Sequence, residues 1–345
     1  MVDEVNPEFI KWLAQATQCE VKHATLIQPL WSEQGACFRA TLSPVGTSAT
    51  KRVVAKCAQP RLGSHHPKGW SGNTSFKRKC RSFKVEAYFY THLQPFTTQD
   101  CKTPKTIALL PSPAGQNQEE QHSNDTLIVM EDLANLYYEK TTMELSPDDA
   151  VVVLKWLAAF HGQFMGVNDK HLWQEGTYWH LGTRLDEFNA MKASPLKDAA
   201  HGLSTRLNKA KYHTVLHGDA KVANFCFTSH LSHCAAIDFQ YTGHGVGVKD
   251  VAYFLGSALS ESDQLAHNQD LLEVYLQALK QALNNKVTIK RHSDREINEI
   301  LQEWRSLYPF ACADFHRFLA GWSPDHWKIN AELTKQTQLA LNALG

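Results

Sequence analysis

The most informative stretch of this sequence is Leu216-His217-Gly218-Asp219-Ala220-Lys221-Val222-Ala223-Asn224-Phe225. It predicts a short apolar strand that ends in a loop, with an Asp in the loop and an Asn five residues later. Two more short strands are predicted at 225–227 and 234–237, and the second ends just before Asp238. If these two strands pair as a hairpin, Asn224 and Asp238 stand at its same open end, about 5 Å apart as opposite positions in paired strands are.

These residue types suit the transfer of a phosphoryl group. Asn224 and Asp238 offer an amide oxygen and a carboxylate, and Mg²⁺ prefers oxygen ligands, commonly one or two carboxylates together with phosphate oxygens. Asp219, at the front of the loop, can orient an attacking hydroxyl and accept its proton, while Lys221 can reach the γ-phosphate. A His-Gly-Asp triplet alone is more often a surface turn. The Asn and the second Asp at these spacings favour Asp219 and Lys221 as catalytic residues and Asn224 and Asp238 as magnesium ligands.

The chain as a whole changes from mainly strand to mainly helix. Its first third predicts a helix, three strands, a helix and two strands, at 7–18, 24–31, 36–43, 52–58, 75–93, 105–110 and 126–130. Ser146 and Pro147, an N-cap residue and a first helical residue, open a long helix. Strands return at 213–216, 225–227 and 234–237, and helices are predicted at 250–260, 263–283, 294–305 and 328–343. A sheet-rich part followed by a helical part indicates an α+β plan with two lobes.

Length and composition argue against several classes of protein. The 345 residues are too many for one compact core, so two domains are expected. The 35 acidic and 35 basic residues balance, which argues against a broad nucleic-acid surface. Apolar runs are far shorter than the roughly 20 residues that span a bilayer, so no membrane association is expected. The eight cysteines form no C-x-x-C pair and are expected to be reduced thiols of a cytoplasmic protein.

The stretch quoted first resembles the catalytic loop and metal-binding motif of the aminoglycoside phosphotransferase and choline kinase superfamily, where H-G-D stands in place of the protein-kinase H-R-D. The motif Asp238-Phe239-Gln240, followed by Asp250-Val251-Ala252-Tyr253-Phe254-Leu255, resembles the ecdysteroid-kinase-like branch most. The resemblance implies a protein-kinase-like fold of two lobes with ATP and Mg²⁺ as cofactors. It implies an antiparallel-sheet, nucleotide-binding lobe at 1–133 and a mainly helical catalytic and acceptor-binding lobe at 134–345. In that branch the later Asp, here Asp250, braces the catalytic loop.

The resemblance also assigns residues of the first lobe. Kinases hold the α- and β-phosphates with a strand Lys, which pairs with a Glu on the next helix. Here Lys56 ends Val53-Val54-Ala55-Lys56, and Glu86 lies in the helix that follows. Two solvated charges are the alternative. We expect a partly exposed ion pair, which contributes about 1 kcal/mol or less to stability.

Other nucleotide contacts are implied less strongly. The backbone around Met130 and Glu131 corresponds to the hinge that meets adenine in the family. Gly35, in Ser32–Phe38, stands where protein kinases have three glycines in a phosphate-covering loop. No G-x-x-x-x-G-K-[ST] motif is present, so a P-loop is excluded.

The residues after about 260 leave the acceptor open. They carry Trp304, Tyr308, Trp322 and Trp327 together with acidic residues, which could form a cage for a cationic substrate or simply a helical core. No A-P-E peptide-binding segment follows the metal motif, so we expect the acceptor to be a small molecule with a hydroxyl group. The alternatives are an aminoglycoside kinase, a choline or ethanolamine kinase, and a non-catalytic, nucleotide-binding pseudokinase. The sequence fixes neither the acceptor nor the oligomeric state.

Overall fold

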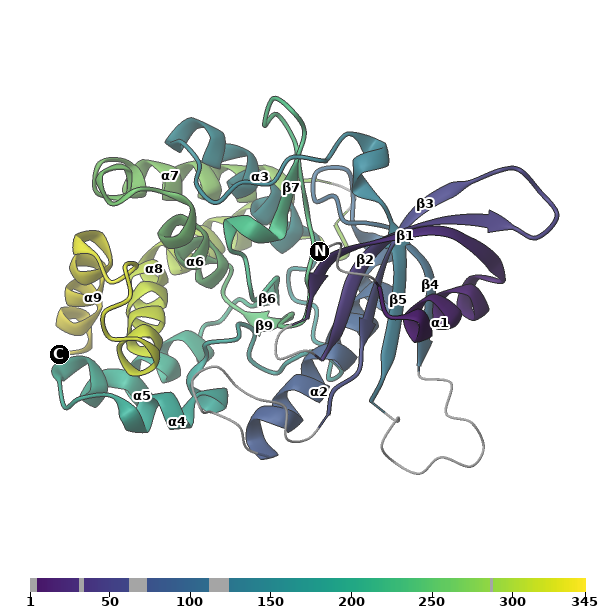
Figure 1. Ribbon diagram of the computed structural model, residues 1–345. Coiled ribbons are helices and arrows are strands. Elements are labelled where there is room, and N and C mark those ends of the chain that lie inside the picture. The colour runs from purple at the N-terminus through teal and green to yellow at the C-terminus, as the bar shows by residue number, and fades with distance from the viewer. Residues whose placement is uncertain (1–4, 31–33, 62–72, 112–123, 286–287) are drawn as a thin grey trace. The chain divides into compact units, whose positions relative to one another are not determined.

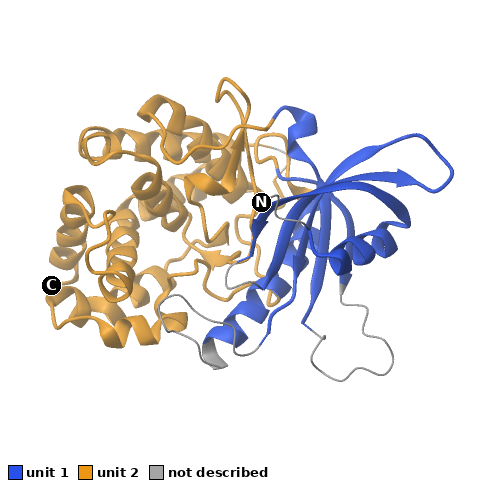
Figure 2. Ribbon diagram, viewed as in Figure 1, with its two compact units in different colours: residues 1–95, 103–137 blue, residues 96–102, 138–345 orange. Residues whose placement is uncertain are grey.

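The computed structural model describes residues 5–30, 34–61, 73–111, 124–285 and 288–345. The chain forms two compact units (Figure 2). Unit 1 comprises residues 1–95 and 103–137, and unit 2 comprises residues 96–102 and 138–345. Unit 1 contains an antiparallel sheet and unit 2 is mostly helical, so the expected α+β class is confirmed.

Unit 1 is built on one five-stranded antiparallel sheet with strand order β1-β2-β3-β5-β4. Its strands are β1 (Cys19–Pro29), β2 (Gly35–Pro44), β3 (Lys51–Ala58), β4 (Thr106–Pro111) and β5 (Thr126–Glu131). Two helices accompany the sheet, α1 (Pro7–Thr17) and α2 (Asn73–Tyr88), and α2 continues as a π-helical turn over Phe89–Leu93 (Figure 1).

The alternation of side chains along β3 sends successive residues to opposite faces of this sheet. Val53, Ala55 and Cys57 pack in the cluster that contains Trp12 and Leu13 of α1. Ala58 instead packs with Phe83 of α2. Because Lys56 and Ala58 are two residues apart in the strand, they share a face, and the Lys56 side chain is directed to α2.

Unit 2 contains the loop between Leu216 and Phe225, together with long helices. Its helices are α3 (Pro147–Gln163), α4 (Leu185–Ala190), α5 (Pro195–Asn208), α6 (Val248–Ala258), α7 (Glu261–Leu283), α8 (Asp294–Trp322) and α9 (Ala331–Leu344). Its short strands are β6 (Thr214–Leu216), β7 (Phe225–Phe227), β8 (Cys234–Ala236) and β9 (Gly243–Gly245), which pair as β6 with β9 and β7 with β8. The two small ladders hold the segments on either side of the loop between Leu216 and Phe225.

Several predicted elements of unit 2 need correction. Helix α5 was not predicted, although Ser194 and Pro195 open it with the same cap-and-proline pattern that opens α3. Helix α8 does not end at 305, because it continues through Pro309 to Trp322. Helix α9 begins at Ala331 with Asn330 as its N-cap, so the preceding residues 323–330 form a connection and not a helix.

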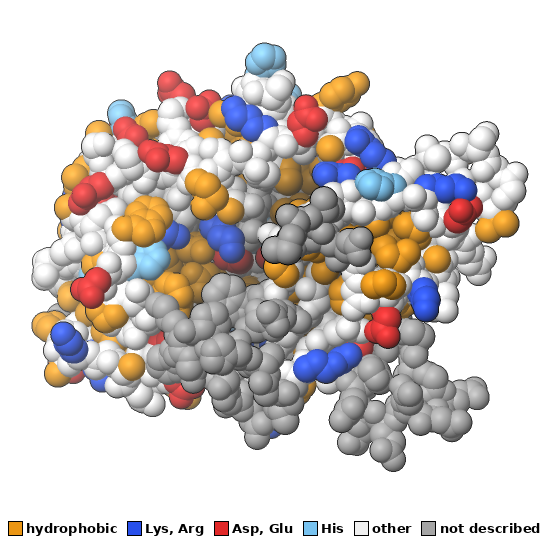
Figure 3. All heavy atoms as spheres, in the orientation of Figure 1, with side chains coloured by type: hydrophobic (Ala, Val, Ile, Leu, Met, Phe, Trp, Pro, Cys, Tyr) orange, Lys and Arg blue, Asp and Glu red, His pale blue; other side chains and the backbone are white. Residues whose placement is uncertain are grey.

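Surface and covalent features add three observations. No helix in the described ranges is both long and apolar enough to cross a membrane. All eight cysteines lie in described residues and none forms a disulfide. On the face in Figure 3, acidic and basic side chains of the described residues are interspersed, without separation by sign.

Candidate active site

The hairpin expected from the sequence is present. Strands β7 and β8 pair antiparallel with Phe225 opposite Ala236. The backbone N–H of Ile237 then donates to the carbonyl of Asn224 at 3.0 Å, which extends the ladder by one bond. Asn224 and Asp238 therefore lie at the same end of the hairpin.

Asp219 lies at the centre of a short-range polar cluster. Its carboxylate is buried, with 7% of the residue exposed. The amide Nδ2 of Asn224 donates to Oδ2 of Asp219 at 3.0 Å and to its backbone carbonyl at 2.8 Å. The Nζ of Lys221 lies 3.2 Å from the same Oδ2. The other carboxylate oxygen, Oδ1, is buried and accepts no hydrogen bond among the described residues.

The electrostatics of this cluster keep Lys221 charged. The carboxylate of Asp219 raises the pKa of Lys221 above its ordinary value, and Asp238 adds to the effect, although burial opposes it. Lys221 is therefore an ammonium at neutral pH, held next to the proposed base.

Asp250 stabilises the loop through hydrogen bonds to its backbone. Its carboxylate accepts the backbone N–H of His217 at 2.7 Å and that of Gly218 at 3.0 Å. It also lies 3.1 Å from Nε2 of His161, whose Nδ1 is 2.8 Å from the hydroxyl of Tyr275. His161 is thus a hydrogen-bonded core histidine, and the brace that the resemblance implied for Asp250 is present.

His217 and Gly218 shape the backbone before Asp219. The N–H of Asp219 donates to Nδ1 of His217 at 3.2 Å, so the proton of the neutral ring is on Nε2, which lies 3.0 Å from the carbonyl of Ile237. Burial lowers the pKa of His217, which favours this neutral form. Gly218 has φ +83°, and a Cβ there would lie 2.0 Å from the carbonyl oxygen of Tyr241. Only glycine fits at this position.

Two tyrosines beside Asp219 were not predicted from the sequence. The hydroxyl of Tyr178 donates to that of Tyr253 at 3.3 Å. Burial raises the pKa of both tyrosines, and the nearby carboxylate of Asp219 raises them further. Tyr253 lies in the segment after Asp250 that carried the family resemblance, but nothing in the sequence pointed to Tyr178.

Asp238 follows the hairpin in a backbone conformation that few residues adopt. It has φ +69°, in the left-handed region where Asp and Asn are enriched among non-glycine residues. The half-buried carboxylate acts electrostatically on Lys221 and on His217, so it lies in the same polar cluster.

The donor atoms at the end of the hairpin fit a magnesium ion. Nδ2 of Asn224 donates to Asp219, so the amide oxygen is the atom of this side chain that could ligate a metal, and Asp238 offers a carboxylate. Among the described residues no group of three His, Cys, Asp or Glu side chains forms a candidate metal site. The pair of Asn224 and Asp238 contains only one of these four residue types, so it does not meet that criterion. Mg²⁺ commonly binds to one or two carboxylates together with phosphate oxygens, which is consistent with such a pair.

The Lys and Glu expected in unit 1 do form an ion pair. The Nζ of Lys56 lies 2.8 Å from Oε1 and 2.7 Å from Oε2 of Glu86. The expectation of a partly exposed pair was wrong, because 7% of Lys56 and 1% of Glu86 are exposed. The pair is buried between β3 and α2, since the strand alternation directs Lys56 to the helix face that carries Phe83 and Glu86.

The other nucleotide contacts predicted in unit 1, Gly35, Met130 and Glu131, lie in strands β2 and β5. Gly35 has φ +128°, and a Cβ there would lie 1.9 Å from the carbonyl oxygen of Cys57. The close approach of β3 thus requires glycine, whatever covers the phosphates; residues 31–33 of that loop lie outside the described ranges. Met130 is buried in β5, and the N–H of Glu131 donates to the backbone carbonyl of Lys105 at 2.8 Å. Contact of Met130 and Glu131 with adenine stays a prediction.

The aromatic residues after 300 divide into two groups. Trp304 and Tyr308 are core residues of α8, and they hydrogen-bond to the carbonyl of Tyr212 and to the side chain of Asn268. Trp327, in contrast, is 64% exposed, and Trp322 is half-buried.

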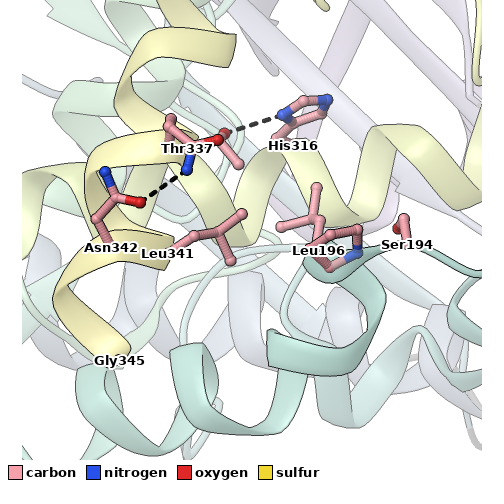
Figure 4. A pocket seen from close by; sticks show the side chains of 9 residues that line it. Ser194, Leu196, His316, Thr337, Leu341, Asn342 and Gly345 are labelled. Atoms are coloured by element: carbon pink, nitrogen blue, oxygen red, sulfur yellow. Dashed lines mark hydrogen bonds between the residues drawn. The ribbon is translucent and has the colours of Figure 1, made fainter.

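One described pocket has none of the candidate site residues in its lining (Figure 4). Its volume is about 630 Å³ and it is lined by Ser194, Pro195, Leu196, His316, Thr337, Gln338, Leu341, Asn342 and Gly345. Nδ1 of His316 hydrogen-bonds the hydroxyl of Thr337 at 2.9 Å, and burial lowers the pKa of His316 to about 4. None of the lining residues carries a carboxylate side chain or an ammonium group. We assign no catalytic role to this pocket.

Comparison with known proteins places this geometry in context. Residues 176–286, which include the catalytic loop, the hairpin and Asp250, match the model of the ecdysteroid kinase-like family. The match confirms the resemblance to that branch that the motifs indicated. No curated protein matches the chain in sequence.

Two solved structures of kinases share the fold along nearly the whole chain. An amicoumacin kinase in complex with AMP-PNP, Ca²⁺ and Ami has a TM-score of 0.51 and 11% identity, over 98% of this chain and 92% of that chain. A microcompartment-associated aminopropanol kinase has a TM-score of 0.50 and 13% identity, over 98% of this chain and 95% of that chain. At this identity the likeness establishes a kinase-like fold alone.

Proposed function

We propose, from the match to the ecdysteroid kinase-like family and from the geometry around Asp219, that this chain is an ATP- and magnesium-dependent kinase that phosphorylates a hydroxyl group of a small molecule. The observation that carries the proposal is the buried carboxylate of Asp219. Asn224 and Lys221 hold one of its oxygens, and the other accepts no hydrogen bond among the described residues. A buried acceptor atom without a donor is costly, so its presence in the folded protein favours a ligand that donates to it.

The chemistry assigned to these residues is a single displacement. The acceptor hydroxyl donates its proton to Oδ1 of Asp219 while its oxygen forms a bond to the γ-phosphorus of ATP. The bond between that phosphorus and the bridging oxygen breaks, and ADP leaves with the electron pair. Lys221 remains an ammonium and neutralises charge on the transferred group.

The metal is assigned to Asn224 and Asp238. When bound, Mg²⁺ neutralises negative charge on the phosphate oxygens. Asp219 orients Asn224 through two hydrogen bonds, which directs the amide oxygen to the ligand position. The loop itself is held by Asp250 through the N–H groups of His217 and Gly218.

Unit 1 is assigned the nucleotide. We expect the Lys56 ammonium, held by Glu86, to bind the α- and β-phosphates. The complex of an amicoumacin kinase with AMP-PNP, an ATP analogue, supports ATP as the phosphoryl donor. Binding of adenine by the backbone near Met130 and Glu131, and cover of the phosphates near Gly35, are further parts of this proposal.

The test is an ATP-consumption screen of the purified chain with Mg²⁺ against choline, ethanolamine, amino sugars, sterols and nucleosides, followed by ³¹P NMR of the product. We expect a phosphate monoester with one of these classes and none in the Asp219→Asn variant. A pseudokinase would bind ATP and show the same background hydrolysis in the wild type and in that variant with every acceptor.

A further inference from the structure

Lys328 occupies a position for which neither the motifs nor the fold gives a reason. It lies in the connection 323–330 between α8 and α9. Its Nζ stands 4.8 Å from the ring centre of Tyr253, 5.4 Å from that of Trp327 and 5.9 Å from that of Phe315. A cation within about 6 Å of an aromatic face is attracted by the ring. Three rings around one ammonium form an aromatic cage, which we define as Tyr253, Phe315 and Trp327.

The ammonium in this cage has no hydrogen-bonded or ion-paired partner among the described residues. The backbone N–H of Lys328 donates to Nδ1 of His326 at 3.2 Å. Burial lowers the pKa of Lys328 to about 8, and the nearby Asp219 carboxylate opposes this effect while Lys221 adds to it. The cage therefore lies within electrostatic reach of the catalytic carboxylate.

Tyr253 connects the cage to the surroundings of Asp219. Tyr253 belongs both to the cage and to the tyrosine pair with Tyr178, whose pKa the Asp219 carboxylate raises in addition to burial. Trp327 is 64% exposed, so one wall of the cage borders solvent. A small molecule whose hydroxyl reaches Asp219 would meet these rings with the rest of its structure.

We propose that Lys328 is a specificity-determining residue, whose own ammonium fills the aromatic cage beside Asp219 and thereby excludes acceptors that carry a quaternary ammonium or a protonated amine. The inference rests on the proposed kinase function. A cationic acceptor would gain the attraction of the rings only by displacing a charge of the same sign. An acceptor without a cationic group meets no such penalty. Lys328 thus acts by exclusion, which is a common basis of specificity.

A matched pair of alcohols tests the exclusion. Choline and 3,3-dimethylbutan-1-ol have nearly the same shape and differ in one positive charge. We expect the wild type to have a kcat/KM at least about tenfold higher for the uncharged alcohol. Lys328→Ala empties the cage and should remove or reverse that preference. Lys328→Met removes the charge but keeps a side chain in the cage, so it should improve use of the uncharged alcohol without a comparable gain for choline.

Binding of tetramethylammonium separates this inference from the proposed function, because it needs no turnover. Tryptophan fluorescence, with Trp327 as a reporter, follows the titration. We expect saturable binding to Lys328→Ala, at least about tenfold tighter than to the wild type. The exposed Lys192→Ala should behave as the wild type does. Urea unfolding of each variant verifies that it is folded.

The outcomes are distinct. A folded Lys328→Ala variant that binds tetramethylammonium no better than the wild type overturns the inference. Wild-type protein that prefers choline to its uncharged isostere overturns it as well. If no alcohol is phosphorylated by any variant, the kinase proposal fails, while the titration still decides whether Lys328 blocks a cation site.

Discussion

The side chain of Asn224 is fixed by Asp219 at two atoms, through bonds of 2.8 Å to the backbone carbonyl and 3.0 Å to the carboxylate. The positions of the proposed base and the proposed metal ligand are therefore coupled by these two hydrogen bonds. A change in the position of Asp219 moves the amide oxygen of Asn224 as well. This coupling determines which substitutions can separate proton transfer from metal binding.

Asp219→Asn is the variant that isolates proton transfer. The new amide oxygen can still accept from Asn224, so the loop should keep its geometry, but the side chain no longer accepts a proton from the alcohol. We expect turnover to fall by roughly two orders of magnitude or more, with ATP affinity nearly unchanged. Steady-state kinetics and calorimetric ATP titration measure the two effects, and the exposed Asp270→Asn serves as the control. Unimpaired turnover would remove Asp219 from the mechanism.

Asp238→Asn tests the metal assignment without disturbing the backbone. The residue has φ +69°, which Asn tolerates better than Ala does. Loss of the carboxylate should raise the Mg²⁺ concentration needed for ATP binding and leave adenosine binding unchanged, since adenosine has no phosphates. Calorimetric titrations at several Mg²⁺ concentrations measure this. Equal loss of ATP and adenosine binding would indicate a folding defect and contradict the assignment.

Lys56→Met should affect both stability and activity, because the pair with Glu86 is buried. The variant leaves a buried carboxylate without its cation, and breaking a buried pair in this way costs about 3–5 kcal/mol. In the double variant Lys56→Met/Glu86→Leu neither charge remains, so much of the stability should return. Turnover should stay low in both, because misplaced phosphates cost roughly a hundredfold per Å. Urea unfolding and kinetics of both variants provide the measurement. Recovery of turnover in the double variant would make Lys56 purely structural.

Glu175 should make the stability of unit 2 sensitive to acid. Burial opposes its ionisation, but Lys249, at 2.9 Å, and His180 outweigh burial and hold the pKa of Glu175 well below its ordinary range. An unfolded chain takes up the proton near pH 4.3, so the unfolded state binds more protons than the native state below that pH. The stability from Glu175 is thus present above about pH 4.3 and is lost as the pH falls toward the folded value.

The test compares urea unfolding of the wild type and Glu175→Gln at several pH values. At pH 7 we expect the wild type to be more stable, because the variant leaves the buried Lys249 without that carboxylate. The difference should shrink as the pH drops below 4.3. The exposed Glu139→Gln should show no such trend. A difference that is constant with pH would mean that Glu175 stabilises the fold by packing alone.

Much of the candidate site could be predicted because its geometry is local. Asn224 and Asp238 meet at one end of a hairpin of two three-residue strands, and the register of such a hairpin follows from a few neighbouring residues. Lys56 and Glu86 meet because strand alternation and helical spacing each fix a direction. Helix α5 carried an N-cap signal at Ser194 that could have been used, whereas α8 continues through Pro309, which usually ends a helix.

The sequence by itself determined the identity and local order of the candidate site residues, since each lies within one strand, loop or hairpin whose backbone geometry depends on a few neighbouring residues. Only the tertiary structure decided which side chains that are distant in the sequence contact one another. The burial of the Lys56–Glu86 pair depends on how a helix covers a sheet face. The cage around Lys328 gathers rings from α6, α8 and the connection after it, brought together by core packing. The periodicity of the sequence does not predict these contacts, because side-chain burial and electrostatic environment are properties of the packed fold.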